Sequence, residues 1–179
     1  MTVREVLLLS ASFLDDKELA AALSGSSVTG EAETLLNCFN VIENEIALDD
    51  YPLKMTETLS FENGLLPYPK FAKTPIDVLS VKSGDVRVHF TLTPAGVRCD
   101  CAEGEVTYTY APTAKTISGT SEHGGKISAR LMALGVASEY CFVKGRTDEG
   151  KIWGVKYREA LKSAGILRHP LCVRSRRWA

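Results

Sequence analysis

An amphipathic helix is predicted by the stretch Leu35-Leu36-Asn37-Cys38-Phe39-Asn40-Val41-Ile42-Glu43-Asn44-Glu45-Ile46. Its apolar stripe of Leu35, Phe39, Ile42 and Ile46 falls at offsets of 0, 4, 7 and 11 residues, which is the period of one helix face. From Pro52 onward the apolar residues alternate instead, as they do along half-buried strands. This change of period indicates helices followed by a strand-rich segment.

The pattern on either side of that stretch extends both predictions. Two shorter helices precede it, over 3–14 and 17–23, and two more follow the strands, over 126–143 and 147–164. Between them, Val86–Leu92 alternates strictly, and Asn63-Gly64 is typical of a tight hairpin turn between 57–62 and 65–66. Further strands are predicted over 76–81, 97–101 and 106–110. We therefore predict an α+β fold, a helical bundle with an antiparallel β-meander inserted between three N-terminal and two C-terminal helices.

The length of 179 residues suits one domain. We expect a single α+β domain over 1–167, with a helical body of 1–50 and 126–165 and a β-rich insert of 52–112. Residues 168–179 are expected to form a basic extended tail. The polar, Gly/Ser/Thr-rich segment 111–125 is expected to be a mobile, protruding loop.

The composition excludes several classes of protein. With 45% hydrophobic and 24% charged residues, the chain is ordinary for a globular protein and unlike a disordered or fibrous one. It has no apolar run long enough to cross a membrane, and we expect neither a secretion signal nor membrane association. The five cysteines are accordingly expected to be reduced thiols, with Cys38 and Cys141 buried in helices.

The net charge of −1 conceals a strong asymmetry. Residues 1–50 carry ten acids and two bases, whereas residues 51–179 carry 19 bases and 12 acids. The two regions can face each other or water within one molecule. Alternatively, copies can associate head-to-tail through opposite charges, and such contacts close into rings or extend into filaments.

The C-terminal tail is the most distinctive local feature. It contains Arg168, Arg174, Arg176, Arg177 and Trp178, and no acid follows Glu159. Such a tail can solubilise a chain end, dock on a partner subunit or contact phosphates. We assign these five residues as candidate partner-binding residues. The acidic first third argues against a dedicated nucleic-acid reader, so any contact with nucleic acid is expected to be nonspecific.

Catalytic signatures are weak. The Glu122–Lys126 stretch, with Gly124-Gly125, precedes a predicted helix and could hold an anion, although a loop is the simpler interpretation. Asp49-Asp50 is interpreted as a solvated helix end and His89 as an exposed strand residue. Cys99 and Cys101 share one face of a strand, but no further ligands lie at metal-site spacing. We expect no catalytic residues, no cofactor and no metal.

Several stretches together resemble a known group of proteins. They are Leu35–Ala47 followed by Tyr51-Pro52-Leu53, Leu66–Phe71 leading into Ile76–Val81, Val106–Pro112, Ala137–Cys141, Trp153–Tyr157 and Arg174–Trp178. In these stretches the chain is similar to structural proteins of phages and prophages of Gram-positive bacteria, in particular head–tail connector or tail-adaptor proteins. The likeness covers most of the chain, and its motifs are structural.

The resemblance implies a virion assembly protein and no enzyme. In that group, helices and an inserted strand-rich lobe build a subunit, and copies form a ring beneath the portal. It implies a homo-oligomer that contacts portal or tail proteins and is located in the virion or in the bacterial host cytoplasm. The sheet is larger relative to the helices than in mostly helical connectors, so another neck or baseplate component is an alternative role.

Two other functions stay open at this level. One is a small-ligand binding module or an enzyme, with a site between sheet and helices near residues 119–126. The other is a regulatory nucleic-acid binder whose affinity depends on the tail arginines.

Overall fold

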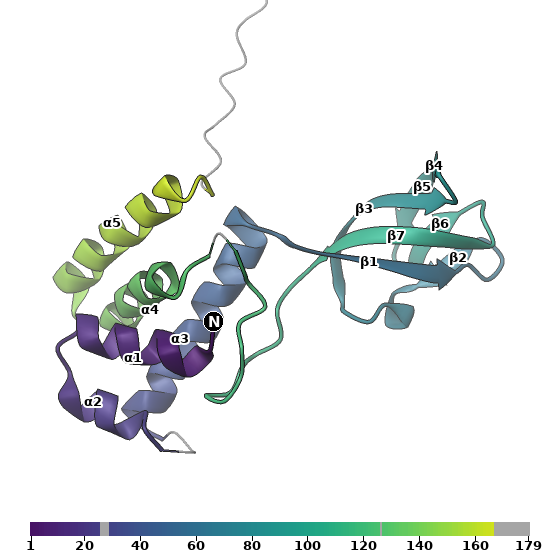
Figure 1. Cartoon of the computed structure of the whole chain (residues 1–179). Helices are drawn as coiled ribbons and strands as arrows, with labels where there is room; N and C mark the ends of the chain where they lie inside the picture. Colours follow the sequence, from purple (N-terminus) through teal and green to yellow (C-terminus); the bar gives the residue numbers. More distant parts are fainter. Residues whose placement is uncertain (26–28, 126, 167–179) are drawn as a thin grey trace, which may run out of the picture. The chain divides into compact units, whose positions relative to one another are not determined.

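The computed structural model describes residues 1–25, 29–125 and 127–166. The chain forms five described helices and two antiparallel sheets, and in the sequence the strands lie between the N- and C-terminal helices, which confirms the predicted α+β class (Figure 1). The chain divides into two compact units. The helical unit comprises Met1–Glu43 and the described residues from Ala114 onward, and the sheet unit comprises Asn44–Thr113. None of the described helices is long and apolar enough to cross a membrane.

The first two helices begin directly after residues that cap them. Helix α1 (Val3–Phe13) has a capping box between Thr2 and Glu5, and α2 (Lys17–Ala22) begins after Asp16, whose carboxylate accepts from the Leu19 amide. Helix α3 (Glu31–Glu45) continues into one wide π-helical turn, η1 (Ile46–Asp50). The four residues of the predicted apolar stripe are all buried, which confirms the helical interpretation of this stretch.

Helix α4 (Ala129–Val143) is the centre of the helical unit. Its residues 131–138 are all buried, and it packs against α1 and against α5 (Thr147–Ser163). Gly135 allows this approach, since a Cβ there would lie 2.9 Å from Ile42 Cγ2 of α3 and 3.0 Å from the Tyr157 ring of α5. A helix buried on all sides has no polar face, and the sequence of α4 accordingly shows little amphipathic contrast.

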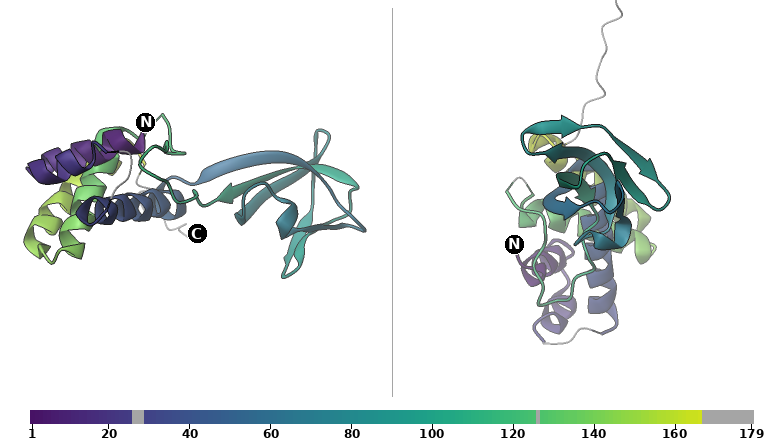
Figure 2. Two further views of the ribbon diagram at one scale, coloured as in Figure 1. Left: turned by 90° about the horizontal axis from the view of Figure 1, so that it is seen from below. Right: turned by 90° about the vertical axis from the view of Figure 1, so that its right-hand side faces the viewer.

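The sheet unit contains two antiparallel sheets. In the first, the strand order is β1-β7-β3-β4, formed by Leu53–Ser60, Glu103–Tyr110, Pro75–Ser83 and Val86–Val88. In the second, the order is β2-β6-β5, formed by Leu65–Pro67, Gly96–Cys99 and Phe90–Thr93. Figure 2 shows the long strands β1 and β7 running side by side, and their register pairs Leu53 with Tyr110 and Ser60 with Glu103.

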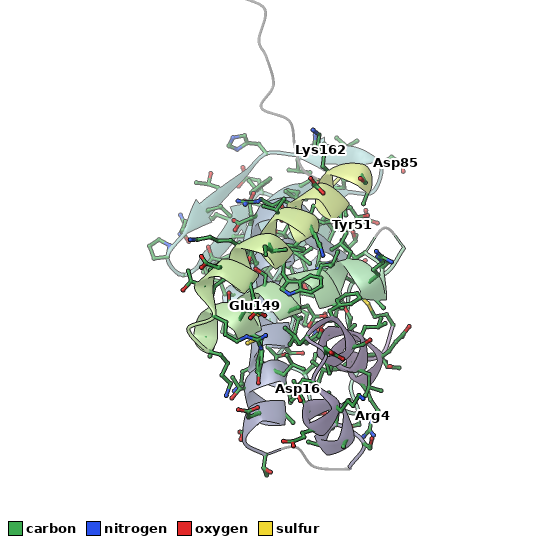
Figure 3. The ribbon with its side chains drawn as sticks, turned by 90° about the vertical axis from the view of Figure 1, so that its left-hand side faces the viewer. Arg4, Asp16, Tyr51, Asp85, Glu149 and Lys162 are labelled. Atoms are coloured by element: carbon green, nitrogen blue, oxygen red, sulfur yellow. The ribbon has the colours of Figure 1, made fainter. Side chains whose placement is uncertain are left out.

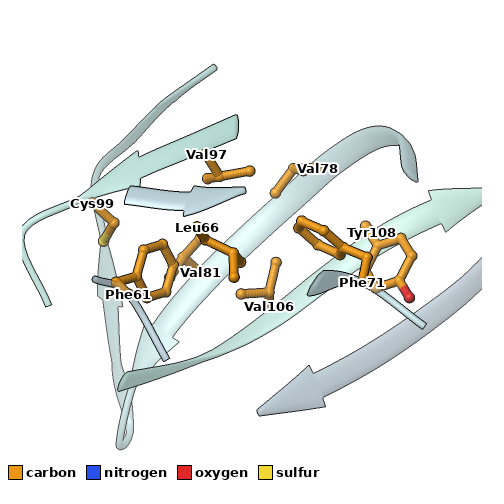
Figure 4. Close-up of a cluster of buried hydrophobic side chains, with 9 residues drawn as sticks. All are labelled: Phe61, Leu66, Phe71, Val78, Val81, Val97, Cys99, Val106 and Tyr108. Carbon is orange, nitrogen blue, oxygen red and sulfur yellow. The ribbon is translucent and has the colours of Figure 1, made fainter. Parts of the chain in front are cut away.

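One cluster of side chains forms the core of the sheet unit (Figure 4). It is aromatic and aliphatic, and it consists of Phe61, Leu66, Phe71, Val78, Val81, Val97, Cys99, Val106 and Tyr108. Phe71 meets Tyr108 edge-to-face, with ring centroids 4.9 Å apart, which is a favoured aromatic geometry. The Tyr108 hydroxyl donates to Glu57, so the polar end of this core tyrosine is satisfied.

The strand order differs from a simple meander in two places. The turn at Asn63-Gly64 forms as predicted, with positive φ at both residues, but the long strand before it pairs with β7 and not with β2. The predicted strand over 86–92 is interrupted at His89, and its halves β4 and β5 pair in different sheets. Alternation of side chains cannot reveal such a break, because both halves retain a period of two.

The segment between β7 and α4 is bound to the helical unit. Over 114–125, Thr120 forms a β-bridge with Thr2, and the Val3 amide donates a hydrogen bond of 3.0 Å to Gly119 O. The Asn40 side chain forms two hydrogen bonds with the backbone of Lys115. Ile117 and His123 are buried. The prediction of a protruding mobile loop is therefore wrong for this stretch, because these two side chains and the backbone bonds anchor it.

Candidate functional site

The predicted partner-binding residues Arg168, Arg174, Arg176, Arg177 and Trp178 lie outside the described residues. The remaining candidates are surfaces and hollows within residues 1–25, 29–125 and 127–166. Two sets of exposed charged residues lie in the helical unit.

An acidic set lies on the first three helices. It consists of the exposed residues Glu5, Asp15, Glu18, Glu31 and Glu33. Four of these acids occupy first turns of α1, α2 and α3, where a negative charge interacts favourably with the helix dipole. Part of the acidity of residues 1–50 is thus explained by helix formation, and the exposed carboxylates also leave a negative surface.

Glu31 links the acidic set to the end of α4. Its carboxylate accepts from Lys144 Nζ at 2.8 Å and from the Tyr140 hydroxyl at 3.2 Å. The hydrogen bonds from Lys144 and Tyr140 lower the pKa of Glu31. Desolvation and the nearby Glu31 charge raise the pKa of Tyr140 to about 12, so this tyrosine stays a donor at neutral pH.

The solvent side of α5 carries charges of both signs. We define the outer α5 face as its exposed charged and apolar residues, Asp148, Glu149, Lys151, Ile152, Val155, Lys156, Arg158, Glu159 and Lys162. Ile152 is 56% and Val155 47% exposed, so two branched apolar side chains lie among four bases and three acids, and Asp148 is ion-paired with Lys151. The opposite side of the helix packs inward through Tyr157 and Leu161. Figure 3 looks onto α5, with Glu149 near its start and Lys162 near its end.

An aromatic stack fixes one edge of this face. Trp153 stacks on Phe13 of α1 with ring centroids 5.4 Å apart, and Lys156 Nζ lies 4.1 Å from the centroid of the Trp153 ring. A cation above a tryptophan face is held electrostatically. Lys156 is therefore a positioned charge on the outer α5 face.

The candidate anion site before α4 lacks the expected geometry. The first turn of α4 is capped by Ser128, whose hydroxyl accepts from the Leu131 amide at 3.2 Å. Glu122 forms an ion pair with Lys115, and its amide donates to the buried Glu43 carboxylate at 3.0 Å. Gly124 and Gly125 belong to the preceding turn, and Lys126 lies outside the described residues. Both glycines are exposed, and a Cβ at either would meet nothing within 4 Å, so they serve as part of an exposed turn in which Gly125 adopts a positive φ.

His123 completes this buried polar network. Its Nε2 lies 3.2 Å from the Glu43 carbonyl oxygen, to which it donates, and the side chain is 2% exposed. Burial lowers the pKa of His123, with the opposing influence of Glu43 and Glu122 smaller. Sequence reasoning missed this network because its residues are polar and lie far apart in the chain. The one feature of the sequence that indicates burial of this segment is the apolar Ile117 among polar residues.

The other chemical candidates are scattered. Asp50 ends η1, and desolvation and the Asp49 charge raise its pKa. His89 is exposed, as predicted. It lies between β4 and β5, however, and not within one continuous strand. Among the described residues, no three His, Cys, Asp or Glu side chains gather as metal ligands.

Two hollows lie in the sheet unit. One, of about 480 Å³, is lined by Phe61, Asn63, Gly64 and residues 99–102. The other, of about 230 Å³, is lined by Tyr68, Leu92 and residues of the start of β3. The residues that line the first include Cys99 and Cys101, the predicted Cys-x-Cys pair, and the lining of the second is mainly apolar.

Comparison with known proteins adds no assignment. No protein-family model and no curated protein matches the chain.

Proposed function

We propose that the chain is a structural subunit of a virion, a head–tail connector or adaptor whose copies associate head-to-tail. The observation that carries the proposal is the uneven distribution of charge within the helical unit, with the acidic set on and between α1–α3 and an outer α5 face that has one more base than acid and carries exposed Ile152 and Val155. Opposite charges steer association and set its register, and apolar side chains among the charges supply contact area.

The resemblance to phage connector proteins supports the virion role. A subunit of this kind acts on its copies and on portal or tail proteins, in the virion or in the host cytoplasm before assembly. The terminal arginines and Trp178 contribute a second contact in this proposal, since arginine and tryptophan are frequent interface anchors.

A head-to-tail contact is heterologous, so each copy uses two different surfaces. Such contacts build rings when the rotation closes. An isologous dimer, by contrast, uses the same surface on both copies, so each contact occurs twice and the assembly closes at two subunits.

Self-association as a function of salt tests the proposal. We expect sedimentation velocity to show oligomers at low ionic strength that dissociate as salt rises. Lys156→Gln with Lys162→Gln should weaken them, whereas Asp85→Asn, an exposed change in the β3–β4 turn, should not. Association that strengthens with salt and ignores the lysine changes would contradict a charge-steered contact.

A second measurement addresses the virion role. Deletion of residues 168–179 is expected to reduce the yield of complete particles in producing cells, without loss of folded protein. Unchanged particle assembly, together with no affinity for portal or tail components, would count against the connector assignment.

A further inference from the structure

The two cysteines of the sheet unit lie in direct contact. Cys99 ends β6 and is 3% exposed, and Cys101 follows two residues later with partial exposure. Their Sγ atoms are 3.3 Å apart, and one thiol donates to the other. The described Cys38 and Cys141, by comparison, are buried in two different helices of the helical unit.

The backbone holds this pair in place from both sides. The Cys99 amide donates to Gly64 O at 2.9 Å, and the Phe61 amide donates to Ala102 O at 2.8 Å. A Cβ on Gly104 would lie 3.4 Å from Cys101 Sγ, so that side is closely packed. Asp100 lies between the cysteines at a bend, where the regular strand has ended.

One member of the pair is accessible. Cys99 and Cys101 both line the hollow of about 480 Å³, which is open to solvent, and Cys101 is partly exposed whereas Cys99 is buried. Cys101 is therefore the residue that a small reagent reaches, with the Cys99 thiol already beside it. This combination of contact and access distinguishes the pair from buried cysteines that serve only as small hydrophobic side chains.

We propose that Cys99 and Cys101 form a redox modification site, a dithiol that closes to an intramolecular disulfide by exchange with low-molecular-weight disulfides. The sulfur atoms need to approach by about 1.3 Å to reach bonding distance. The backbone can make the accompanying shift at the bend at Asp100, between the two cysteines. The site goes beyond the assembly role and does not depend on it.

The exchange proceeds in two balanced steps. Cys101, the more exposed thiol, loses its proton and attacks one sulfur of the small disulfide, which forms a mixed disulfide and expels one thiolate. Cys99 then loses its proton and attacks Sγ of Cys101, which forms the intramolecular bond and expels the second thiolate. Both protons end on the two small thiols, and two electrons pass from the protein to the small disulfide.

The ionisation of the pair sets the rate. Desolvation, followed by the hydrogen bond and the charge of Cys99, raises the pKa of Cys101 to about 11. Because the thiolate is the nucleophile, the exchange is expected to be slow at neutral pH and to accelerate as pH rises.

The test uses the full chain with mixtures of oxidised and reduced glutathione, followed by acid quenching, alkylation and intact-mass analysis. We expect a product lighter by two hydrogen atoms, with the bond mapped to a peptide containing both Cys99 and Cys101. Cys99→Ser should lose this product and retain glutathione on Cys101, since no neighbouring thiol displaces it. Cys38→Ser is the matched control and should react like the natural chain.

A second probe needs no variant. Phenylarsine oxide binds two adjacent thiols by forming two As–S bonds with release of water, and it should protect both cysteines from alkylation until a small dithiol removes it. The proposal is overturned if both thiols remain free in oxidising buffer, if glutathione stays on Cys101 in the natural chain, or if the arsenical fails to protect the pair.

Discussion

Single residues explain several features that a helix or strand pattern leaves open. Gly96 is required because β6 approaches β2 very closely: a Cβ there would lie 2.1 Å from the Leu66 carbonyl oxygen. His123 and Glu43 are polar residues in the interior, and their hydrogen bonds join the segment before α4 to α3. Both features depend on neighbours far along the chain, so the sequence alone could not predict them.

Gly96→Ala is expected to destabilise the chain. The added methyl group would collide with the Leu66–Pro67 backbone, which cannot rotate away as a side chain could. Overpacking of this kind costs about 2 kcal/mol or more. Urea unfolding measures the loss. Gly84→Ala is the control, because a Cβ at Gly84 meets nothing within 4 Å, and only the strain of its positive φ should register. Equal losses in the two variants would contradict a collision.

Stability is expected to fall as the pH drops through the range in which free histidine titrates. Burial lowers the pKa of His123 in the folded state, so the unfolded chain binds a proton that the folded chain does not. The contribution of His123 to the unfolding free energy is fully present above the pKa that His123 has in the unfolded chain, and it is lost as the pH falls below that value. His123→Gln should flatten the pH profile of the unfolding free energy.

The exposed His89 supplies the matched comparison. His89→Gln should leave the pH profile of stability as it is in the natural chain, since this side chain lies on the surface between β4 and β5. An identical flattening by both substitutions would place the pH dependence outside the buried network.

At the scale of elements, the helices follow the sequence closely and the strands less so. Capping residues and a period of 3.6 are local signals, and the starts of α1, α2 and α5 lie within a residue or two of the predicted positions. Helix α4 begins later than predicted, at Ala129, because Ser128 supplies its cap. Strand pairing is nonlocal, and so the place of β7 between β1 and β3 and the break at His89 had no local signal.

Gly135→Ala tests the packing of the central helix. Alanine favours an isolated helix over glycine by about 1 kcal/mol. Against this, the new methyl group would press on Ile42 and on the Tyr157 ring, at 2.9 and 3.0 Å, and overpacking costs about 1–3 kcal/mol. We expect a net loss of about 1 kcal/mol by thermal or urea unfolding.

Gly154→Ala on α5 is the contrasting substitution. Its Cβ would meet only the Ser138 hydroxyl, at 3.1 Å. The Ser138 hydroxyl donates to Gly150 O at 2.9 Å, so it can move only by weakening this buried bond, which offsets the higher helix propensity of alanine. We therefore expect little net change in stability. A loss at Gly135 no larger than at Gly154 would contradict close packing between α4 and its neighbours.

At the scale of the whole molecule, the spacing of apolar residues predicted the α+β class, and the charge asymmetry could be counted from the sequence. The two-residue spacing of Cys99 and Cys101 predicted that they lie on one face of a strand. The exposed Ile152 and Val155 were not predicted as a surface, because an apolar pair on a helix is more often interpreted as core. In the structure Tyr157 and Leu161 pack on the opposite side of α5, which leaves Ile152 and Val155 facing solvent.

The central claim, that copies join through two unlike surfaces, is tested most directly by mixing two disabled variants. Glu18→Gln with Glu33→Gln removes charge from the acidic set, and Ile152→Asp with Val155→Asp places acids on the outer α5 face. Each variant retains one intact surface. Native mass spectrometry of the mixture should show a one-to-one pair that grows no further, whereas each variant alone stays monomeric. Larger oligomers in either variant alone, or no pairing on mixing when the natural chain assembles, would contradict the head-to-tail account.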